Sequence, residues 1–263
     1  MSLGVIIPVF NSEKYILRLL KLLEIQMDYL DEIVFVDDGS KDNSLGILTE
    51  WKNKIRRVKI LSQSNEGASA ARQNGLELIK TDYVTFIDSD DIIAENYFEE
   101  INKIINSNPN CDMYVLSYKT VYSQKNIYPR INEVGKFNNA RDYVQSVFEG
   151  KTIGDAALWN HVYDIKFLKK NNISFDREAK IAEDCLFNDV CMLCVNSVFV
   201  SDYAGYMWIC DHESLTSRCP LNMGETLNKH IDYIEQICTK YKLEERYVLH
   251  IKKWAFSNIG NQI

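Results

Sequence analysis

The stretch Tyr83-Val84-Thr85-Phe86-Ile87-Asp88-Ser89-Asp90-Asp91 joins a run of apolar residues to three closely spaced carboxylates. Its apolar part, 84–87, is rich in β-branched and aromatic residues, which is typical of a buried strand. The carboxylates follow where that strand would end, and ligands of open α/β sheets bind at this edge. Three crowded anions repel one another, so a divalent cation with oxygen ligands would explain them. The alternative is a polar turn before a helix, with Ser89 or Asp91 as the N-cap.

The chain before this stretch alternates predicted strands and helices at regular spacing. Strands are predicted at 3–10, 33–36, 58–61 and 84–87, and helices at 13–23, 42–54 and 68–79. This order predicts a parallel sheet with right-handed crossovers. Polar residues follow each strand and should therefore meet at one edge: Asn11, Asp37 with Asp38, Asn65, and Asp88 to Asp91. Neither a G-x-G-x-x-G nor a G-x-x-x-x-G-K-[ST] sequence occurs, so dinucleotide and P-loop sites are not indicated.

Composition limits the classes of function. The 263 residues suffice for one large domain or a domain with a lobe, and 46% hydrophobic residues are normal for a globular protein. The net charge of -7 argues against general nucleic-acid binding, which needs clustered Lys and Arg. The 7 cysteines fit buried thiols in a reducing compartment, and the lone C-x-x-C at Cys191 and Cys194 has no partner pair at zinc spacing. No apolar run is long enough to predict a membrane span.

The regular alternation ends after about residue 105. We expect a strand at 113–118, one or two strands at 198–209, helices at 138–148 and 182–195, and two helices within 227–263. The polar segment 119–136 is expected to form extended segments or a mobile loop.

Two acidic motifs about 50 residues apart carry a resemblance to a known family. Asp37-Asp38-Gly39-Ser40 and Asp88-Ser89-Asp90-Asp91 resemble motifs of nucleotide-sugar glycosyltransferases with the GT-A fold, and the chain is most similar to glycosyltransferase family 2. Further matches follow in the family's order: Val5 to Asn11, Asn65-Glu66-Gly67, Ala71 to Gly75, Leu158-Trp159-Asn160, and Glu183-Asp184. Together they extend from residue 3 to about residue 218.

The resemblance implies an α/β fold of the GT-A type, with a Rossmann-like, mostly parallel sheet flanked by helices. It also implies three parts. Residues 1–105 would form the nucleotide-sugar-binding half, 106–218 the acceptor-binding half of the same domain, and 219–263 a C-terminal helical extension.

On the donor side, the resemblance implies a nucleotide sugar, expected to be UDP-linked because the Asp38 carboxylate can accept from the imide N–H of uracil. Asp38 could instead cap the following helix. Asp88 and Asp90 match the family's DxD motif. Asp90 would contact Mn²⁺ or Mg²⁺, Asp88 would contact that metal or the ribose, and the metal would neutralise the diphosphate. Arg72 would contact the ligand or pair with a structural carboxylate. The expected donor contacts are Pro8, Val9, Asn11, Asp38, Asn65, Arg72, Asp88, Ser89 and Asp90.

On the acceptor side, the resemblance implies that Asp184 is the general base of an inverting transfer. The alternative is that Glu183-Asp184 only favours a helix N-terminus. Trp159 would close the sugar or acceptor pocket or be a core residue, and His161 stands where the family often has Lys. His212 would be a third metal ligand, a diphosphate contact or a plain surface residue. The expected substrate contacts are Trp159, Asn160, Asp91, Glu183 and His212.

The predicted function is therefore metal-dependent, inverting transfer of a hexosyl or N-acetylhexosaminyl group from a UDP-sugar to a saccharide or lipid-linked saccharide. The alternatives are a nucleotidyltransferase, which would need a Gly-rich basic loop where Pro8-Val9-Phe10-Asn11 stands, and a nucleotide-sugar-binding protein without turnover. By resemblance the enzyme would be bacterial, cytoplasmic and active in polysaccharide biosynthesis. Lys252, Lys253 and Trp254 would give a peripheral contact with the inner face of the plasma membrane.

Overall fold

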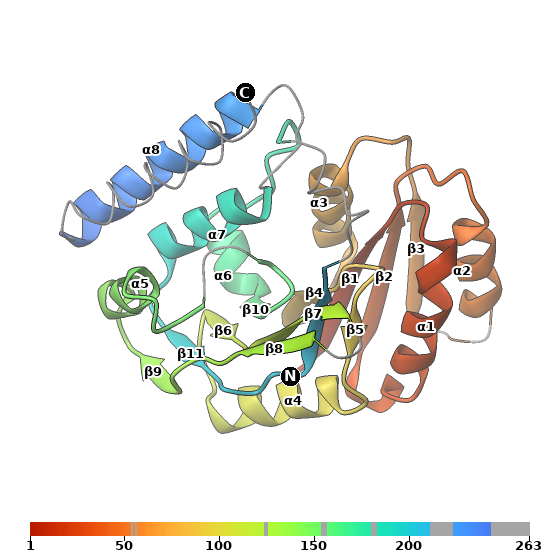
Figure 1. Ribbon diagram of the computed structural model, residues 1–263, viewed down its shortest axis with the longest axis horizontal. Coiled ribbons are helices and arrows are strands. Elements are labelled where there is room, and N and C mark those ends of the chain that lie inside the picture. Colours follow the sequence, from red (N-terminus) through yellow and green to blue (C-terminus); the bar gives the residue numbers. More distant parts are fainter. Residues whose placement is uncertain are drawn as a thin grey trace.

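The computed structural model describes residues 1–53, 55, 57–123, 126–153, 157–179, 183–210 and 223–242. Its centre is an eight-stranded sheet with strand order β3-β2-β1-β4-β10-β6-β11-β9 (Figure 1). A second, four-stranded sheet has the order β5-β12-β7-β8.

The first half forms the predicted alternation of strands and helices. Its elements are β1 (Leu3–Val9), α1 (Glu13–Glu24), a 3-10 turn (Met27–Tyr29), β2 (Glu32–Asp37), α2 (Ser44–Lys52), β3 (Val58–Ser62), α3 (Ala68–Leu78) and β4 (Tyr83–Phe86). Strand β1 pairs in parallel with both β2 and β4, and β2 pairs in parallel with β3. The predicted parallel sheet is confirmed, and its strand ends meet at one edge.

The second half extends this sheet with strands of mixed direction. Its elements are α4 (Tyr97–Ser107), β6 (Met113–Val115), β9 (Gly135–Phe137), α5 (Ala140–Phe148), β10 (His161–Asp164), α6 (Ile165–Lys170), α7 (Glu183–Cys194) and β11 (Val198–Val200). Strand β10 runs antiparallel to both of its neighbours, β4 and β6. It therefore joins the two halves into one sheet.

The second sheet contains β5 (Ile92–Ile93), β7 (Tyr118–Ser123), β8 (Asn126–Arg130) and β12 (Tyr206–Ile209). The prediction of one strand over 113–118 is wrong, because the chain leaves the central sheet after Val115 and enters the second sheet at Tyr118. The fully buried Ser117 holds this crossing: its hydroxyl donates to the Ser201 carbonyl (3.0 Å) and accepts from Asn132 N–H (2.8 Å). The extended alternative for 119–136 is confirmed by the β7–β8 hairpin.

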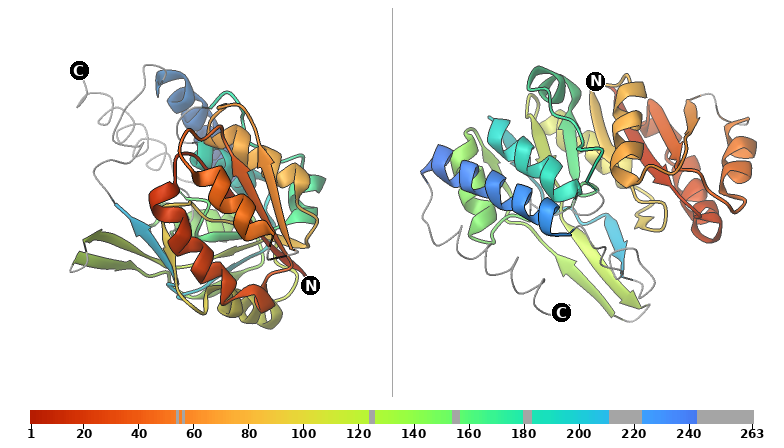
Figure 2. Two further views of the ribbon diagram at one scale, coloured as in Figure 1. Left: turned by 90° about the vertical axis from the view of Figure 1, so that its right-hand side faces the viewer. Right: turned by 90° about the horizontal axis from the view of Figure 1, so that it is seen from above.

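Helices cover both faces of the central sheet (Figure 2). Alternate residues of β1 point to opposite faces: Ile6 packs in the core beneath α3, α5, α6, α7 and α8, and Val5 packs in the core beneath α1, α2 and α4. Since both faces are buried, the strand is apolar throughout. A Cβ on Gly75 of α3 would lie 2.4 Å from a methyl group of Ile6, so the glycine lets α3 lie close against β1.

Helix α8 (Met223–Tyr241) packs along α7. His230 Nδ1 lies 2.6 Å from Asp189 Oδ2 on α7, and Lys229 Nζ donates to Asp176 Oδ2 (2.8 Å). The second predicted helix of 227–263 lies outside the described residues, as do Lys252 to Trp254. Among the helices that the structure describes, none has both the length and the apolar character of a membrane span.

Candidate active site

The loop after β4 carries the three carboxylates that the sequence singles out. The hydroxyl of Tyr206 donates to Asp91 Oδ2 (2.6 Å), and Ile209 N–H donates to Asp91 Oδ1 (2.7 Å). Asp91 is only 2% exposed, and both of its carboxylate oxygens accept hydrogen bonds from the protein. The alternative in which Asp91 caps a helix is wrong, because β5 follows it. Its contacts favour a structural role, which is to tie the loop to β12.

The backbone of the same loop is held from the other side by α1. Arg18 donates to the carbonyls of Asp90 (2.6 Å) and Asp91 (3.3 Å). The Ser89 hydroxyl lies 2.6 Å from that of Ser12, and both side chains are buried. The carboxylates of the loop are therefore presented from a fixed backbone.

Electrostatic repulsion is built into this loop. Asp90 keeps an exposed surface, but the protein around it removes part of its hydration, and this effect together with Asp88 raises the pKa of its carboxyl. Burial, followed by repulsion from Asp88 and Asp90, raises the pKa of Asp91 well above its usual value. A bound cation would relieve this repulsion.

The carboxylates of this loop fit a cation that takes only a few of its ligands from the protein. Within the described residues, no group of three or more His, Cys, Asp or Glu side chains is placed to hold a metal. His212 lies outside the described residues, so its predicted part in a metal site stays a prediction. Mg²⁺ is commonly held by one or two carboxylates and substrate phosphates, and Asp88 and Asp90 suit that pattern.

Arg72 on α3 joins the carboxylate loop to the start of α7. It is 7% exposed and donates to Asp88 Oδ1 (2.8 Å) and to Glu183 Oε1. Burial opposes its charge, but the carboxylates of Asp88, Glu183 and Asp184 outweigh burial and raise the pKa of the guanidinium. Arg72 therefore pairs with carboxylates, and its contact with a ligand stays a prediction. The Arg72 Nε group has no partner among the described residues.

Asp184 lies in the first turn of α7, next to this bridge. Its Oδ1 accepts from Cys185 N–H (2.9 Å), and its side chain is half-buried. Burial, and then the negative charge of Glu183, raises its pKa to about 7, although Arg72 acts in the opposite direction. A carboxyl with this pKa exchanges protons near neutral pH, as a general base requires.

Asp38 supports the turn before α3. Its Oδ1 accepts from Gln63 Nε2 (2.9 Å) and Glu66 N–H (2.8 Å), and its Oδ2 accepts from Gly67 N–H (2.8 Å). Asp38 therefore does not cap the next helix, α2, as the alternative held. Asn65 is exposed in the supported turn.

Pro8 and Val9 end β1, where the Val9 carbonyl accepts from Asp38 N–H (2.8 Å). Asn11, at φ 50, then braces the loop after β2: it accepts from Lys41 N–H (2.8 Å) and donates its own N–H to the Ser40 hydroxyl (3.0 Å). The loops after β1, β2 and β3 thus form one hydrogen-bonded edge, as predicted.

Trp159 belongs to an aromatic cluster under this edge. It is 7% exposed and stacks on Tyr206 (centroids 4.5 Å apart, planes at 7°), with Tyr118 edge-on at 4.6 Å. These contacts favour the core alternative. Asn160 is also buried: its Nδ2 donates to the carbonyls of Leu116 and Ile153, and its Oδ1 has no partner within the described residues. His161 is fully buried in β10.

The structure brings Arg72, Asp88, Glu183 and Asp184 together, and it holds Asp90 in the adjoining loop. Sequence reasoning missed two residues that position this group, Arg18 and Tyr206. Neither stands in a motif, and their contacts with the loop cross 72 and 115 residues of chain. The alternation of aromatic residues in 206–209 was the one available signal for Tyr206.

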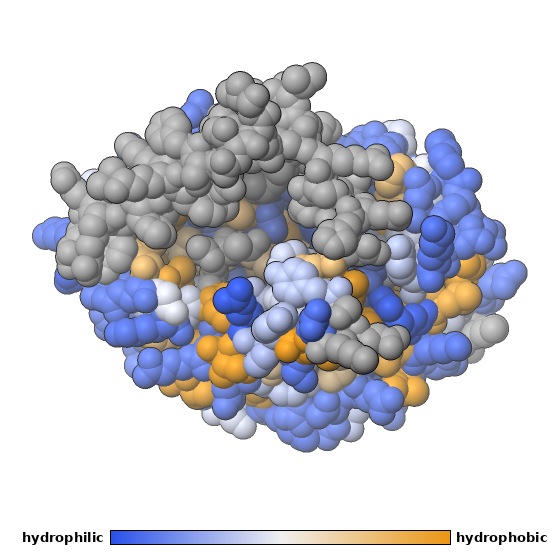
Figure 3. All heavy atoms as spheres, in the orientation of Figure 1, coloured by the Kyte–Doolittle hydropathy of each residue, from blue (hydrophilic) through white to orange (hydrophobic). Residues whose placement is uncertain are grey.

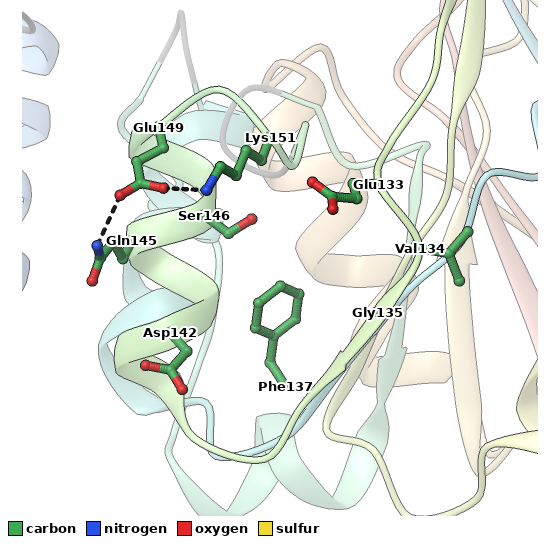
Figure 4. A pocket seen from close by; sticks show the side chains of 9 residues that line it. All are labelled: Glu133, Val134, Gly135, Phe137, Asp142, Gln145, Ser146, Glu149 and Lys151. Atoms are coloured by element: carbon green, nitrogen blue, oxygen red, sulfur yellow. Dashed lines mark hydrogen bonds and ion pairs between the residues drawn. The ribbon is translucent and has the colours of Figure 1, made fainter.

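A cavity of about 370 Å³ lies elsewhere, between β9 and α5 at the far end of the central sheet (Figure 4). The Phe137 ring points into it, and the Lys151–Glu149 ion pair (2.8 Å) borders it. None of the predicted site residues lines this cavity.

The fold and the carboxylate-lined edge define an α/β domain of the GT-A type. The family model for glycosyl transferase family 2 matches residues 4–170. The chain therefore belongs to glycosyl transferase family 2, and the resemblance seen in its motifs is confirmed.

Known relatives support the same family. The putative glycosyltransferase EpsH of Bacillus subtilis (strain 168) is 29% identical over 192 residues, which cover 71% of this chain and 54% of EpsH. The poly(ribitol-phosphate) beta-N-acetylglucosaminyltransferase TarS of Staphylococcus aureus (strain Mu50) is 32% identical over 221 residues, which cover 78% of this chain and 35% of TarS. The crystal structure of S. aureus TarS 1-349 in complex with UDP-GlcNAc matches with a TM-score of 0.77 at 27% identity, over 95% of this chain and 70% of that one. The chain thus spans about half the length of EpsH and about a third of TarS.

Proposed function

We propose that this protein is an inverting, metal-dependent glycosyltransferase that moves a sugar from a UDP-sugar to a hydroxyl of a saccharide or a lipid-linked saccharide. The observation that carries the proposal is the Arg72 bridge. Arg72 donates to Asp88, the expected metal carboxylate, and to Glu183, the neighbour of the expected base Asp184, and this arrangement supports the proposal. A site for the diphosphate and a site for proton removal would then be adjacent.

On the donor side, Asp88 and Asp90 would hold Mn²⁺ or Mg²⁺, which when bound neutralises charge on the leaving diphosphate. Arg72, whose Nε has no partner in the described parts of the chain, would add positive charge beside the phosphates. The edge from Pro8 to Asn11, with Asp38 and Asn65, would hold the nucleoside. The UDP-GlcNAc bound to the related TarS supports a UDP-sugar here.

On the acceptor side, Asp184 would take the proton of the acceptor hydroxyl as its oxygen bonds to the anomeric carbon. The bond from that carbon to the diphosphate oxygen breaks, and UDP leaves with the bonding electron pair. Glu183 keeps Arg72 beside the base and, as a like charge, keeps the pKa of Asp184 high. The assignment of donor binding to 1–105 and acceptor binding to 106–218 belongs to this proposal.

Purified protein incubated with Mn²⁺ and a panel of UDP-sugars, with and without oligosaccharide acceptors, tests the function. We expect UDP release with at least one UDP-sugar, metal dependence, and faster release with acceptor. Pyrophosphate release from UTP and a sugar phosphate would instead identify a nucleotidyltransferase. Binding of a UDP-sugar with no turnover under any of these conditions would identify a binding protein.

A further inference from the structure

One face of the second sheet carries aromatic side chains from β12, β7 and β8, with the buried Thr120 between Trp208 and Tyr128. Tyr206 pairs with Tyr118, and two residues further on Trp208 pairs with Thr120 and Thr120 with Tyr128. Directly paired residues share a face, and so do residues two apart on one strand. This face is the one that meets Trp159, which contacts Tyr206, Tyr118 and Trp208.

The outer part of this face is open to solvent. Trp208 is 37% exposed, Tyr128 55% and Tyr122 57%, and the rings of Tyr122 and Tyr128 meet edge to face with centroids 5.9 Å apart. We call these three residues the aromatic platform. In Figure 3, apolar and weakly polar side chains on this side of the molecule are interspersed with strongly hydrophilic ones. Trp208 and Tyr128 are two strands apart, roughly 10 Å, which is wider than one sugar ring.

The platform is fixed relative to the carboxylate loop. Trp208 stands in β12 between Tyr206 and Ile209, and these two residues supply both hydrogen bonds to Asp91. Any molecule resting on the platform therefore has a defined position relative to Asp90, the neighbour of Asp91. Such a position suits a substrate that must reach the donor.

We propose that the aromatic platform binds the acceptor, and that the acceptor is a saccharide chain longer than one ring. A sugar ring has an apolar C–H face and a polar edge, and Trp and Tyr match it because they combine a flat apolar ring with a polar group. Arg130, exposed and paired with Tyr118 in the same register, offers five donors to sugar oxygens. The inference rests on the proposed function, since the occupant must be a substrate of sugar transfer.

Two other occupants fit less well. Pro129 stands in the edge strand β8 and cannot donate a backbone hydrogen bond, which disfavours pairing with a strand of another protein. A membrane surface usually needs clustered basic residues, but Arg130 is the one basic residue in the paired rows of this face, and the chain has a net charge of -7.

An array of immobilised neutral and acidic oligosaccharides, probed with the whole protein in UDP and Mn²⁺, tests the platform. We expect retention on at least one oligosaccharide, and a loss of about tenfold in affinity for Trp208→Ala and for Tyr128→Ala. Trp208→Phe should recover most of the binding. Tyr29→Ala is the matched control, because Tyr29 is a similarly exposed aromatic residue (38%) away from the second sheet, and it should bind like the wild type. Melting temperatures exclude unfolding as the cause.

Equal retention by the wild type and both alanine variants, or no retention by the wild type, would overturn the proposal. Loss of binding to phosphatidylglycerol vesicles in the same variants, without any oligosaccharide binding, would make a lipid surface the occupant and would also overturn it. UDP affinity, measured separately by calorimetry, reports on the proposed function. If the wild type binds UDP and releases it from a UDP-sugar, but the alanine variants retain oligosaccharides as well as the wild type does, the platform proposal alone is refuted.

Discussion

Two regions that contact the loop from Asp88 to Asp91 position their side chains in different ways. The first, at the start of α7, holds Asp88 and Glu183 through one buried cation, Arg72. The second, under β12, holds Trp159 against Tyr206 by stacking. In the first region, neighbouring charges shift the pKa values of the side chains. In the second region, packing fixes the positions of the rings. A substitution in the first region should therefore change sugar transfer and metal binding. A substitution in the second region should change how the carboxylate loop is positioned.

The largest effect is expected from Asp90→Ala, which removes a proposed metal ligand. Metal-dependent UDP binding and sugar transfer should fall to background, because the variant loses one of the two carboxylates proposed to hold the cation against the diphosphate. The metal-free protein should be no less stable, since Asp90 is one of several repelling carboxylates. Calorimetric UDP titrations with and without Mn²⁺, together with thermal melts, check both statements. Unchanged turnover would remove the metal from the mechanism.

Arg72→Ala should lower the free energy of unfolding by about 3 kcal/mol, because it leaves the carboxylates of Asp88 and Glu183 without their buried partner. Arg177→Ala is the matched control. The Arg177 side chain is 43% exposed and pairs with Glu77 at 3.2 Å, so its loss should cost less than about 1 kcal/mol. Urea denaturation at neutral pH measures both variants. Equal stabilities would mean that the Arg72 bridge does not hold the carboxylate loop to the start of α7.

The raised pKa of Asp184 predicts a pH dependence of transfer. The base must be deprotonated, so the rate at saturating donor should rise through about pH 7 and fall roughly tenfold per pH unit below it. Glu183→Gln should move this limb to lower pH, because it removes a like charge that raises the pKa of Asp184, while Arg72 still lowers that pKa. Rates from pH 5 to 9 test this. A rate that does not depend on pH, or a limb that Glu183→Gln moves to higher pH, would contradict the electrostatic account.

The smallest effect is expected in the aromatic region. Tyr206→Phe keeps the stacking on Trp159 but leaves Asp91 Oδ2 without its donor, at a cost of about 1–2 kcal/mol in unfolding free energy. Mn²⁺ affinity should weaken slightly as the loop loosens. Tyr203→Phe removes a more exposed hydroxyl contact, to Asn96 (3.0 Å), and serves as the control. A larger loss for Tyr203→Phe than for Tyr206→Phe would show that Asp91 does not depend on Tyr206.

Sequence reasoning predicted the first region well and the second poorly. The strand at 84–87, the carboxylates after it and Glu183-Asp184 are local patterns, and a parallel sheet brings strand ends together by topology. The sequence limited Arg72 to two alternative roles but could not choose between them, because its partner Glu183 lies 111 residues away. The split of 113–118 into two sheets depends on Ser117 meeting Ser201 and Asn132, contacts that no local periodicity encodes. The sequence likewise could not decide whether Trp159 contacts a ligand or packs in the core, because its aromatic partners are distant in the chain.

Asp184→Asn tests the central claim most directly. Asn is nearly isosteric and can still accept from Cys185 N–H, but it cannot take a proton. We expect normal UDP affinity and a transfer rate lower by roughly 10² to 10⁴. Because folding raises the pKa of Asp184, the stability that its carboxyl contributes is lost as the pH rises through about 7, so the variant should be no less stable at pH 8. Asp142→Asn, in the first turn of α5, is the control and should transfer normally. An unchanged transfer rate for Asp184→Asn, with UDP affinity and melting temperature also unchanged, would contradict the account and return the search for the base to Glu183 and His212.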